Sequence, residues 1–92
     1  MDISVCIVSW NVATDLRECL ASVRAQRTGL QFETIVVDNA SADGSPDMVR
    51  REFGDVRLIA LDRNRGFAAA SNIAMAHAKG RYFLLLNPDC VL

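Results

Sequence analysis

The sequence lacks the cysteine spacing of a zinc site or of a disulfide framework. Its three cysteines, Cys6, Cys19 and Cys90, are odd in number, and none of them forms a CxxC pair. We expect them to pack as small apolar residues in a reducing, cytoplasmic setting. The cysteine pattern therefore argues against a zinc module and against a small secreted disulfide protein.

Long hydrophobic runs and clustered positive charge are also missing. The longest apolar run, Tyr82 to Leu86, has the length of a strand, and the opening MDISVCIVSW is neither a signal peptide nor a membrane span. The formal net charge is −1, and the basic residues are scattered between Arg17 and Arg81. This distribution argues against nucleic acid as a partner.

Three common loops of binding and catalysis are absent as well. The first apolar segment is followed by SWNVAT, which contains no GxGxxG and no GxxxxGK[ST], and the chain has no GxSxG. The backbone cradles of dinucleotide and nucleoside triphosphate sites and the nucleophile elbow are thus missing. These absences disfavour a standard dehydrogenase, a P-loop enzyme and an α/β-hydrolase.

What is present is the composition of one globular domain over residues 1–92, with 51% hydrophobic and 23% charged residues. Four nearly continuous apolar segments predict buried strands of a parallel sheet that is covered on both faces. These segments are Ile3 to Val8, Phe32 to Val37, Val56 to Leu61 and Tyr82 to Leu86.

Helical patterns separate the four strands. The first has Leu16, Cys19, Leu20 and Val23 on one side, with Thr14 as a predicted N-cap and Gly29 as a stop. The second begins with Ser45 as N-cap before Pro46, carries Val49 and Phe53 inward and ends at Gly54, and the third runs from about Phe67 to Lys79. The alternating order predicts an open α/β fold with right-handed crossovers, helices on both faces and strand order 3-2-1-4.

In such a sheet, ligands bind outside the carboxyl ends of the strands, near the point where the strand order reverses. The residues that follow the predicted strands are mainly polar, and Trp10 adds a large aromatic side chain. They are Ser9, Trp10 and Asn11 after the first strand, Asp38, Asn39 and Ser41 after the second, 62–66 after the third, and 87–89 after the fourth.

Each of these groups has a functional and a structural interpretation. Asp38 is either an acceptor for a ligand hydroxyl or imide, or the aspartate of an Asx turn in DNASADG. Arg63 and Arg65, at the start of a helix, either hold phosphate or are solvated loop residues. Asp89 with Asn87 offers the oxygen ligands that Mg²⁺ or Mn²⁺ prefers, or forms a turn that ends a strand.

Four stretches in this order resemble the inverting family 2 glycosyltransferases with a GT-A fold, and most of all their rhamnosyltransferase-like branch. The stretches are VCIVSWN, TIVVDNASADGS, NRGFAAASN and LLLNPDC, and they span nearly the whole chain. The resemblance implies a Rossmann-like, nucleotide-binding half of such an enzyme. It also implies transfer of a sugar, with rhamnose as the branch suggests, from a nucleotide diphosphate donor to an acceptor hydroxyl of a glycan or lipid-linked molecule.

Site residues follow from the resemblance position by position. Asp89 matches the family's metal ligand, and Asn39 and Ser71 depart from the second aspartate and the arginine that many members carry. The family's general base lies downstream of the metal motif, and no residue of this chain matches it. The matched nucleotide and donor positions are Ser9, Trp10, Asn11, Asp38, Asn39, Asn64, Arg65, Gly66, Asn72 and Asn87.

From these residues we expect the donor-binding part of a glycosyltransferase that is inactive alone, because the base is expected beyond Leu92. The expected cofactor is Mg²⁺ or Mn²⁺, and the expected location is the cytoplasm, with the full-length protein at the inner face of the membrane. An alternative stays open: a non-catalytic α/β module that forms homo-oligomers through the open edge at Tyr82 to Leu86.

Overall fold

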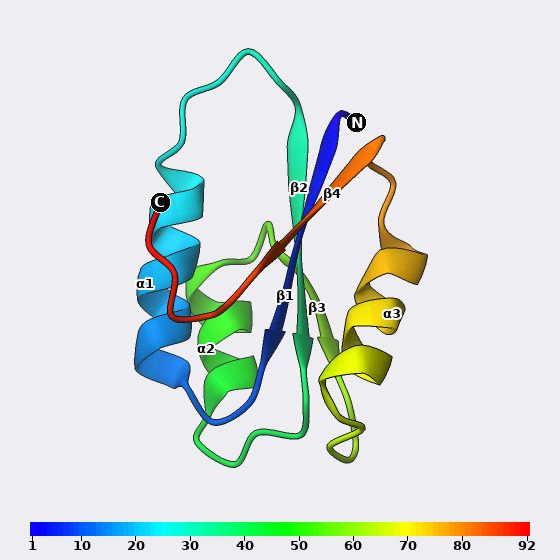
Figure 1. Cartoon of the computed structure of the whole chain (residues 1–92). Helices are drawn as coiled ribbons and strands as arrows, with labels where there is room; N and C mark the ends of the chain where they lie inside the picture. Colours follow the sequence, from blue (N-terminus) through cyan, green and yellow to red (C-terminus); the bar gives the residue numbers. More distant parts are fainter.

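The computed structural model describes residues 1–92 and forms one four-stranded sheet with three helices (Figure 1). The strand order is β3-β2-β1-β4, and every neighbouring pair is parallel, which confirms the predicted topology. None of the helices is long and apolar enough to span a membrane. The elements are β1 (Ile3–Ser9), α1 (Ala13–Arg24), β2 (Phe32–Asp38), α2 (Ser45–Glu52), β3 (Arg57–Ala60), α3 (Phe67–His77) and β4 (Tyr82–Leu86).

Two hydrophobic clusters lie on opposite faces of the sheet. Helices α1 and α2 cover one face, where eleven buried residues, Val5 and Ile7 of β1 among them, form the larger cluster. Helix α3 covers the other face with a smaller cluster of five buried residues that includes Cys6 and Ala70. The alternation of Val5, Cys6 and Ile7 between clusters follows from the two-residue period of a strand, so β1 is buried on both sides.

Strand β4 departs from the predicted burial. Tyr82, Phe83, Leu84 and Leu85 are 69%, 50%, 42% and 49% exposed, and only Leu86 is buried. No helix of the described chain covers β4 from the side away from α1, and its outer edge pairs with no strand. The prediction that the sheet is covered on both faces is therefore right for β1 and β2 and wrong for β4.

The helix boundaries differ from the predicted ones at both ends. Helix α1 begins at Ala13, so Thr14 lies inside its first turn and does not act as the N-cap, and it ends at Arg24, well before Gly29. Helix α2 begins at Ser45 with Gly44 as its N-cap, at φ 84°. That left-handed conformation suits glycine, which explains why the cap position lies one residue earlier than predicted.

The end of the third helix is also earlier than predicted. Helix α3 ends at His77 because Ala78 is already extended, with φ −75° and ψ 141°. Of the three alanines at 68, 69 and 70, only Ala70 is buried against the sheet. The chain then passes so close to β1 that a Cβ on Gly80 would lie 2.5 Å from the Ser4 nitrogen, which explains the glycine.

A hydrogen-bonded cluster connects this passage to the amino end of the sheet. The Ser4 hydroxyl and the Lys79 N–H both donate to Glu33 Oε2 at 2.6 Å, and the Gly80 N–H donates to Ser4 Oγ at 2.8 Å. Burial raises the pKa of Glu33, but these hydrogen bonds and the charges of Arg57 and Lys79 outweigh burial and lower it overall. The ionised form of Glu33 therefore stabilises the fold.

Candidate functional site at the carboxyl edge

The ends of β1 and β2 place two of the predicted site residues side by side. Ser9 and Asp38 are register partners, and the Asn39 N–H donates to the Ser9 carbonyl at 2.8 Å. Ser9 is 0% and Asp38 is 1% exposed. Because partners in adjacent strands point to the same face, both side chains lie on the α1 and α2 side, beneath the loops that follow.

Asp38 builds the loop after β2. Its Oδ2 accepts a 2.8 Å hydrogen bond from the Ser41 N–H, and its Oδ1 accepts one of 2.7 Å from the Ser41 hydroxyl. Of the two interpretations of this residue, the structure shows the Asx-turn contacts. The ligand contact stays a prediction, and it requires a lone pair that these two bonds leave free.

Asn11 joins the loop after β1 to the same turn. Its N–H donates to Ser41 Oγ at 2.8 Å, and its Oδ1 accepts from the Ala42 N–H at 2.7 Å. Asn11 has φ 54°, a left-handed conformation that asparagine tolerates better than most residues. The loops after β1 and β2 are thus one hydrogen-bonded unit.

Asn39 joins this unit to the loop after β3. Its Oδ1 accepts from the Arg65 N–H at 2.9 Å, and its Nδ2 donates to the Gly66 carbonyl at 3.2 Å. Asn39 is only 3% exposed. An ionised aspartate has no donor for the Gly66 carbonyl, so the departure from the family's second aspartate has a local structural reason.

Asp43 is a residue that the sequence-based reasoning missed. Its Oδ2 accepts from the Ala13 N–H of α1 at 2.9 Å, and its Oδ1 accepts from the Ser45 N–H and hydroxyl of α2. The Ser45 hydroxyl is the main cause that lowers the pKa of Asp43, and the N–H groups of Ala13 and Ser45 add to it against burial. One carboxylate thus binds the amino ends of two helices, where negative charge is favourable.

The sequence indicates one of the two helix contacts of Asp43. Aspartate is a residue type that helix starts favour, and Asp43 lies just before the Ser45-Pro46 pair, so its position points to α2. The bond to Ala13 spans 30 residues, so no local pattern indicates it.

The amino end of α3 differs from those of α1 and α2, because it has no acidic residue in its first turn. Asn64 Oδ1 accepts from the Gly66 N–H at 2.8 Å, and Gly66 has φ 82° at the N-cap. Arg65 faces Asp62 at 3.6 Å, and Phe67 is exposed. Of the three helix ends at this edge, that of α3 is the one open to an anion.

Two further predicted residues lie exposed near this edge. Trp10 is 54% exposed at the end of β1, and Asn72 is exposed on α3. Ser9 and Ser71 differ from them, because their hydroxyl oxygens are buried and have no hydrogen-bond partner. The structure thus brings Ser9, Asn11, Asp38, Asn39, Arg65 and Gly66 together and leaves Trp10 and Asn72 free at the surface.

The turn after β4 leaves the sheet beside the end of β1 and contacts α1. The Cys19 thiol donates to the Asn87 carbonyl at 3.8 Å, and the Cys90 N–H donates to the same carbonyl at 3.0 Å. Asn87 and Asp89 are exposed, and no three His, Cys, Asp or Glu side chains gather into a metal-binding group. Asp89 therefore fits a magnesium or manganese ion only as a single carboxylate, whose other ligands come from phosphate and water.

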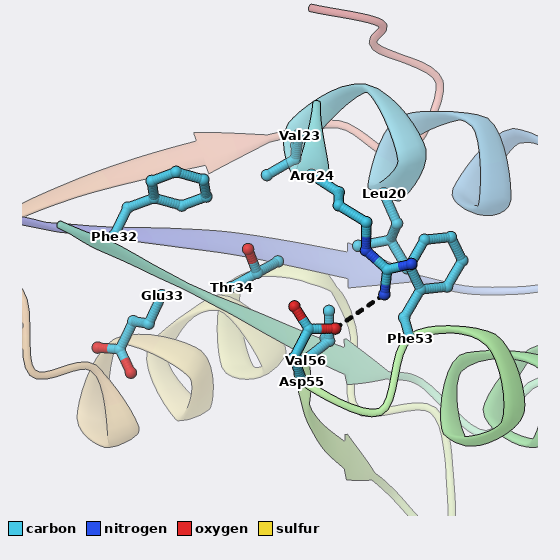
Figure 2. A pocket seen from close by; sticks show the side chains of 9 residues that line it. All are labelled: Leu20, Val23, Arg24, Phe32, Glu33, Thr34, Phe53, Asp55 and Val56. Carbon is cyan, nitrogen blue, oxygen red and sulfur yellow. Dashed lines mark hydrogen bonds and ion pairs between the residues drawn. The ribbon is translucent and has the colours of Figure 1, made fainter. Parts of the chain in front are cut away.

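A cavity of about 170 Å³ lies at the other end of the sheet (Figure 2). Phe32, Glu33 and Thr34 of β2 line it, and Arg24 closes one side, 2.8 Å from Asp55 and stacked at 4.5 Å over the Phe53 ring. In parallel strands this is the amino end, opposite the loops where such sheets bind ligands. None of the predicted site residues lines this cavity.

Comparison with known proteins assigns the chain to a family. The family model described as "Glycosyl transferase family 2" matches residues 4–92. The succinoglycan biosynthesis protein ExoO of Rhizobium meliloti is 38% identical over 89 residues, which are 96% of this chain and 25% of that protein. The glycosyltransferase AglE of Haloferax volcanii is 29% identical over 96% of this chain and 30% of its own length.

Solved structures agree with this assignment. S. aureus TarS superposes with a TM-score of 0.89 at 26% identity, over 99% of this chain and 28% of that chain. A mannosyltransferase from Pyrobaculum calidifontis, solved with GDP-Man and Mn²⁺, superposes with a TM-score of 0.85 at 32% identity, over 97% of this chain and 28% of its own. The chain thus spans about a quarter to a third of these relatives. With the matching family model and the shared sheet topology, the chain belongs to glycosyltransferase family 2.

Proposed function

We propose that this chain binds the nucleotide diphosphate part of a sugar donor at the carboxyl edge of its sheet. The observation that carries the proposal is the amino end of α3, which alone among the three helix ends has no acidic side chain in its first turn. The exposed N–H groups of that end, with Arg63 and Arg65 just before it, favour a diphosphate. Trp10, 54% exposed at the same edge, offers a face on which a base stacks.

The hydrogen-bonded loops give this site its shape. Asn39 holds the backbone at Arg65 and Gly66, and Asp38 with Asn11 holds the turn at Ser41. Because these contacts form within the chain, the backbone at the edge is ordered before any donor binds. Preorganised groups of this kind lose less entropy on binding.

We further propose that the complete protein transfers a hexose, with rhamnose as the first sugar to test, to an acceptor hydroxyl with inversion. Inversion needs a general base, and no residue of this chain takes that role, so the 92-residue chain alone is expected to be inactive. A divalent cation, when bound, supplies positive charge that stabilises the departing diphosphate. Asp89 is the residue that would hold it, with Asn87 beside it. Location in the cytoplasm stays a prediction.

Titration calorimetry with dTDP, UDP and GDP, each with and without Mn²⁺, tests the proposal. UDP and GDP are included because TarS was solved with UDP and the mannosyltransferase with GDP-Man. We expect binding of one nucleotide that weakens at least fivefold in Arg65→Ala and is unchanged in the control Arg50→Ala on the outer side of α2. Absence of heat for every nucleotide at millimolar concentration would overturn the proposal.

A second candidate function rests on the exposure of β4. We propose that the chain also self-associates by pairing β4 with β4 of a second copy. Four consecutive apolar side chains, from Tyr82 to Leu85, are 42% to 69% exposed on an edge strand that has no charged residue within it. Edge strands of stable monomers are usually protected by charge or by a covering element.

Light scattering after size exclusion measures this association. We expect a dimer that dissociates in Leu84→Lys and persists in the control Ala76→Lys, which adds the same charge to the exposed side of α3. A monomer at all concentrations up to about 100 μM would contradict the proposal, because a dimer with a Kd below about 100 μM would be well populated at that concentration.

A further inference from the structure

The cavity of about 170 Å³ at the amino end of the sheet has the volume of a site for one small ring (Figure 2). It lies between the end of α1, the start of β2 and the segment that follows α2. An engineered apolar cavity of about 150 Å³ in another protein binds benzene. By volume, a single six-membered ring therefore fits the cavity of this chain.

Hydrophobic residues make up five of the nine that line the cavity. Leu20 and Val23 of α1 and Phe53 after α2 are 1%, 3% and 5% exposed. Phe32 and Val56 are half-buried. Burial of a ring among such side chains is favourable, and aromatic rings gain further from edge-to-face or offset contacts with one another. The lining therefore favours a planar apolar ligand.

The charged groups at the cavity leave no net charge for a ligand. Arg24 Nη2 donates to Asp55 Oδ1 at 2.8 Å, so the two side chains neutralise each other. The Glu33 carboxylate lies on the opposite face of the sheet, where it accepts from Ser4 and Lys79. A charged ligand would lose hydration here without gaining a counter-charge, so an uncharged ligand is favoured.

Thr34 supplies a polar group inside the cavity. Its side chain is half-buried, and Figure 2 shows it between Phe32 and Asp55. Among the nine lining side chains, only Arg24 and Asp55 are joined by a hydrogen bond, so the Thr34 hydroxyl is bonded to none of them. Since a hydroxyl both donates and accepts, a ligand hydroxyl can pair with Thr34 in either direction.

We propose that this cavity binds a small uncharged phenol, with the ring among the apolar side chains and the hydroxyl at Thr34. A phenolic hydroxyl has a pKa of about 10, so the ligand is neutral at pH 7. Binding of the phenol is independent of the proposed nucleotide site, because the cavity lies at the opposite end of the sheet. A ligand that binds only the folded chain also raises its melting temperature.

NMR titration of the whole isotope-labelled chain with phenol, up to about 5 mM, tests this site. We expect saturable shifts of the N–H signals of lining residues such as Val23, Thr34 and Val56. Benzene should bind more weakly, and the charged analogues benzoate and benzylammonium should shift none of these signals. Shifts that do not saturate, shifts confined to β4 or to the carboxyl edge, or equal binding of phenol and benzoate would overturn the proposal.

Thr34→Val keeps the shape of the side chain and removes its hydroxyl. We expect phenol to bind this variant about threefold to tenfold more weakly, the range that one net hydrogen bond gives, and benzene to bind it unchanged. Thr14→Val, the same change at an exposed position of α1, is the matched control and should alter neither affinity. An unchanged affinity for phenol in Thr34→Val would overturn the assignment of the ligand hydroxyl.

Asp55→Asn tests the charge balance of the cavity. The Asp55 side chain is 74% exposed, so we expect the variant to fold, and its amide leaves Arg24 without a counter-charge. We expect benzoate to bind this variant, because its carboxylate can then pair with the guanidinium. Failure of benzoate to bind would contradict the argument that the cavity selects an uncharged ligand.

Discussion

At the carboxyl edge, buried Asp38 and Asn39 have bonded partners on each side-chain oxygen, whereas on β4 four apolar side chains have no cover. Both regions lie next to β1. Polar groups are unfavourable when they are buried without a hydrogen-bond partner, and apolar groups are unfavourable in water. The side chains of Asp38 and Asn39 are satisfied because their partners, backbone groups and the Ser41 hydroxyl, belong to loops that the chain itself supplies. An apolar strand has no such local solution, since only another layer of structure removes it from water.

The largest expected effect comes from comparing two neighbouring residues within β4, one buried and one exposed. Leu86 is 9% exposed and Leu85 is 49% exposed, although they are neighbours in one strand. We expect Leu86→Ala to lower the free energy of unfolding by about 2–4 kcal/mol, because it leaves a cavity in the larger cluster. Leu85→Ala should change it by less than about 1 kcal/mol. Urea unfolding followed by circular dichroism measures both, and equal effects would show that β4 is covered in solution.

The second prediction tests the hydrogen bonds that the Asn39 side chain makes at the polar edge. In Asn39→Asp, a carboxylate replaces the amide that donates to the Gly66 carbonyl, and the buried oxygen atoms then repel each other. We expect a loss of about 1–3 kcal/mol at pH 7. The loss should shrink as the pH falls toward about 4, where a protonated acid donates again. Asn39→Ala, which removes both bonds without adding charge, should show no such pH dependence. A pH-independent loss in Asn39→Asp would argue against the Gly66 bond.

The third prediction concerns Asp43, which stabilises the amino ends of α1 and α2 together. We expect Asp43→Ala to cost about 1–2 kcal/mol, the upper part of the range for a lost helix cap, because two helices lose an acceptor. Asp47→Ala is the matched control in the first turn of α2, where the side chain is exposed and contacts only Arg50. Its effect should stay within a few tenths of a kcal/mol. Thermal unfolding of both variants compares them directly.

The smallest effect concerns pH at Glu33, at the end of the sheet that lies away from the site. The folded-state pKa of Glu33 is below its ordinary value, so its contribution to stability is complete above about pH 4.5 and is lost as the pH falls through the folded pKa. Glu33→Gln should remove part of the slope of stability against pH in this acid range and leave stability near pH 7 lower than that of the unmutated chain. An unchanged slope in urea unfolding between pH 5 and about 3 would contradict the contacts with Ser4 and Lys79.

Much of the fold was predictable, because the apolar strands and the helices between them are local patterns. All four strands and three helices lie where periodicity and turn residues predicted them, within a few residues, and the parallel order 3-2-1-4 is as expected. The helix starts were less predictable. Thr14 is a good cap by residue type, but Asp43 occupies the end of α1 through space.

The candidate site was predictable as a set of residues and not as a set of contacts. The polar residues after β1, β2 and β3 do meet at one edge, as parallel strands require. That Asn39 bonds to the backbone at Arg65 and Gly66 depends on a contact between residues 26 and 27 positions apart. Contacts between residues so far apart depend on packing, and they produce no periodic pattern in the sequence.

By itself, the sequence determined the order of the elements, the parallel sheet and the glycosyltransferase family, because each depends on residue types at short spacing or on motifs in a fixed order. Only the tertiary structure decided which apolar strand is uncovered, which carboxylate binds two helix ends, and that the Asn87 carbonyl after β4 contacts Cys19 of α1. These features arise where distant segments pack together. The physical reason is that a local pattern sets which face of a strand or helix is apolar, and the rest of the chain sets what covers that face.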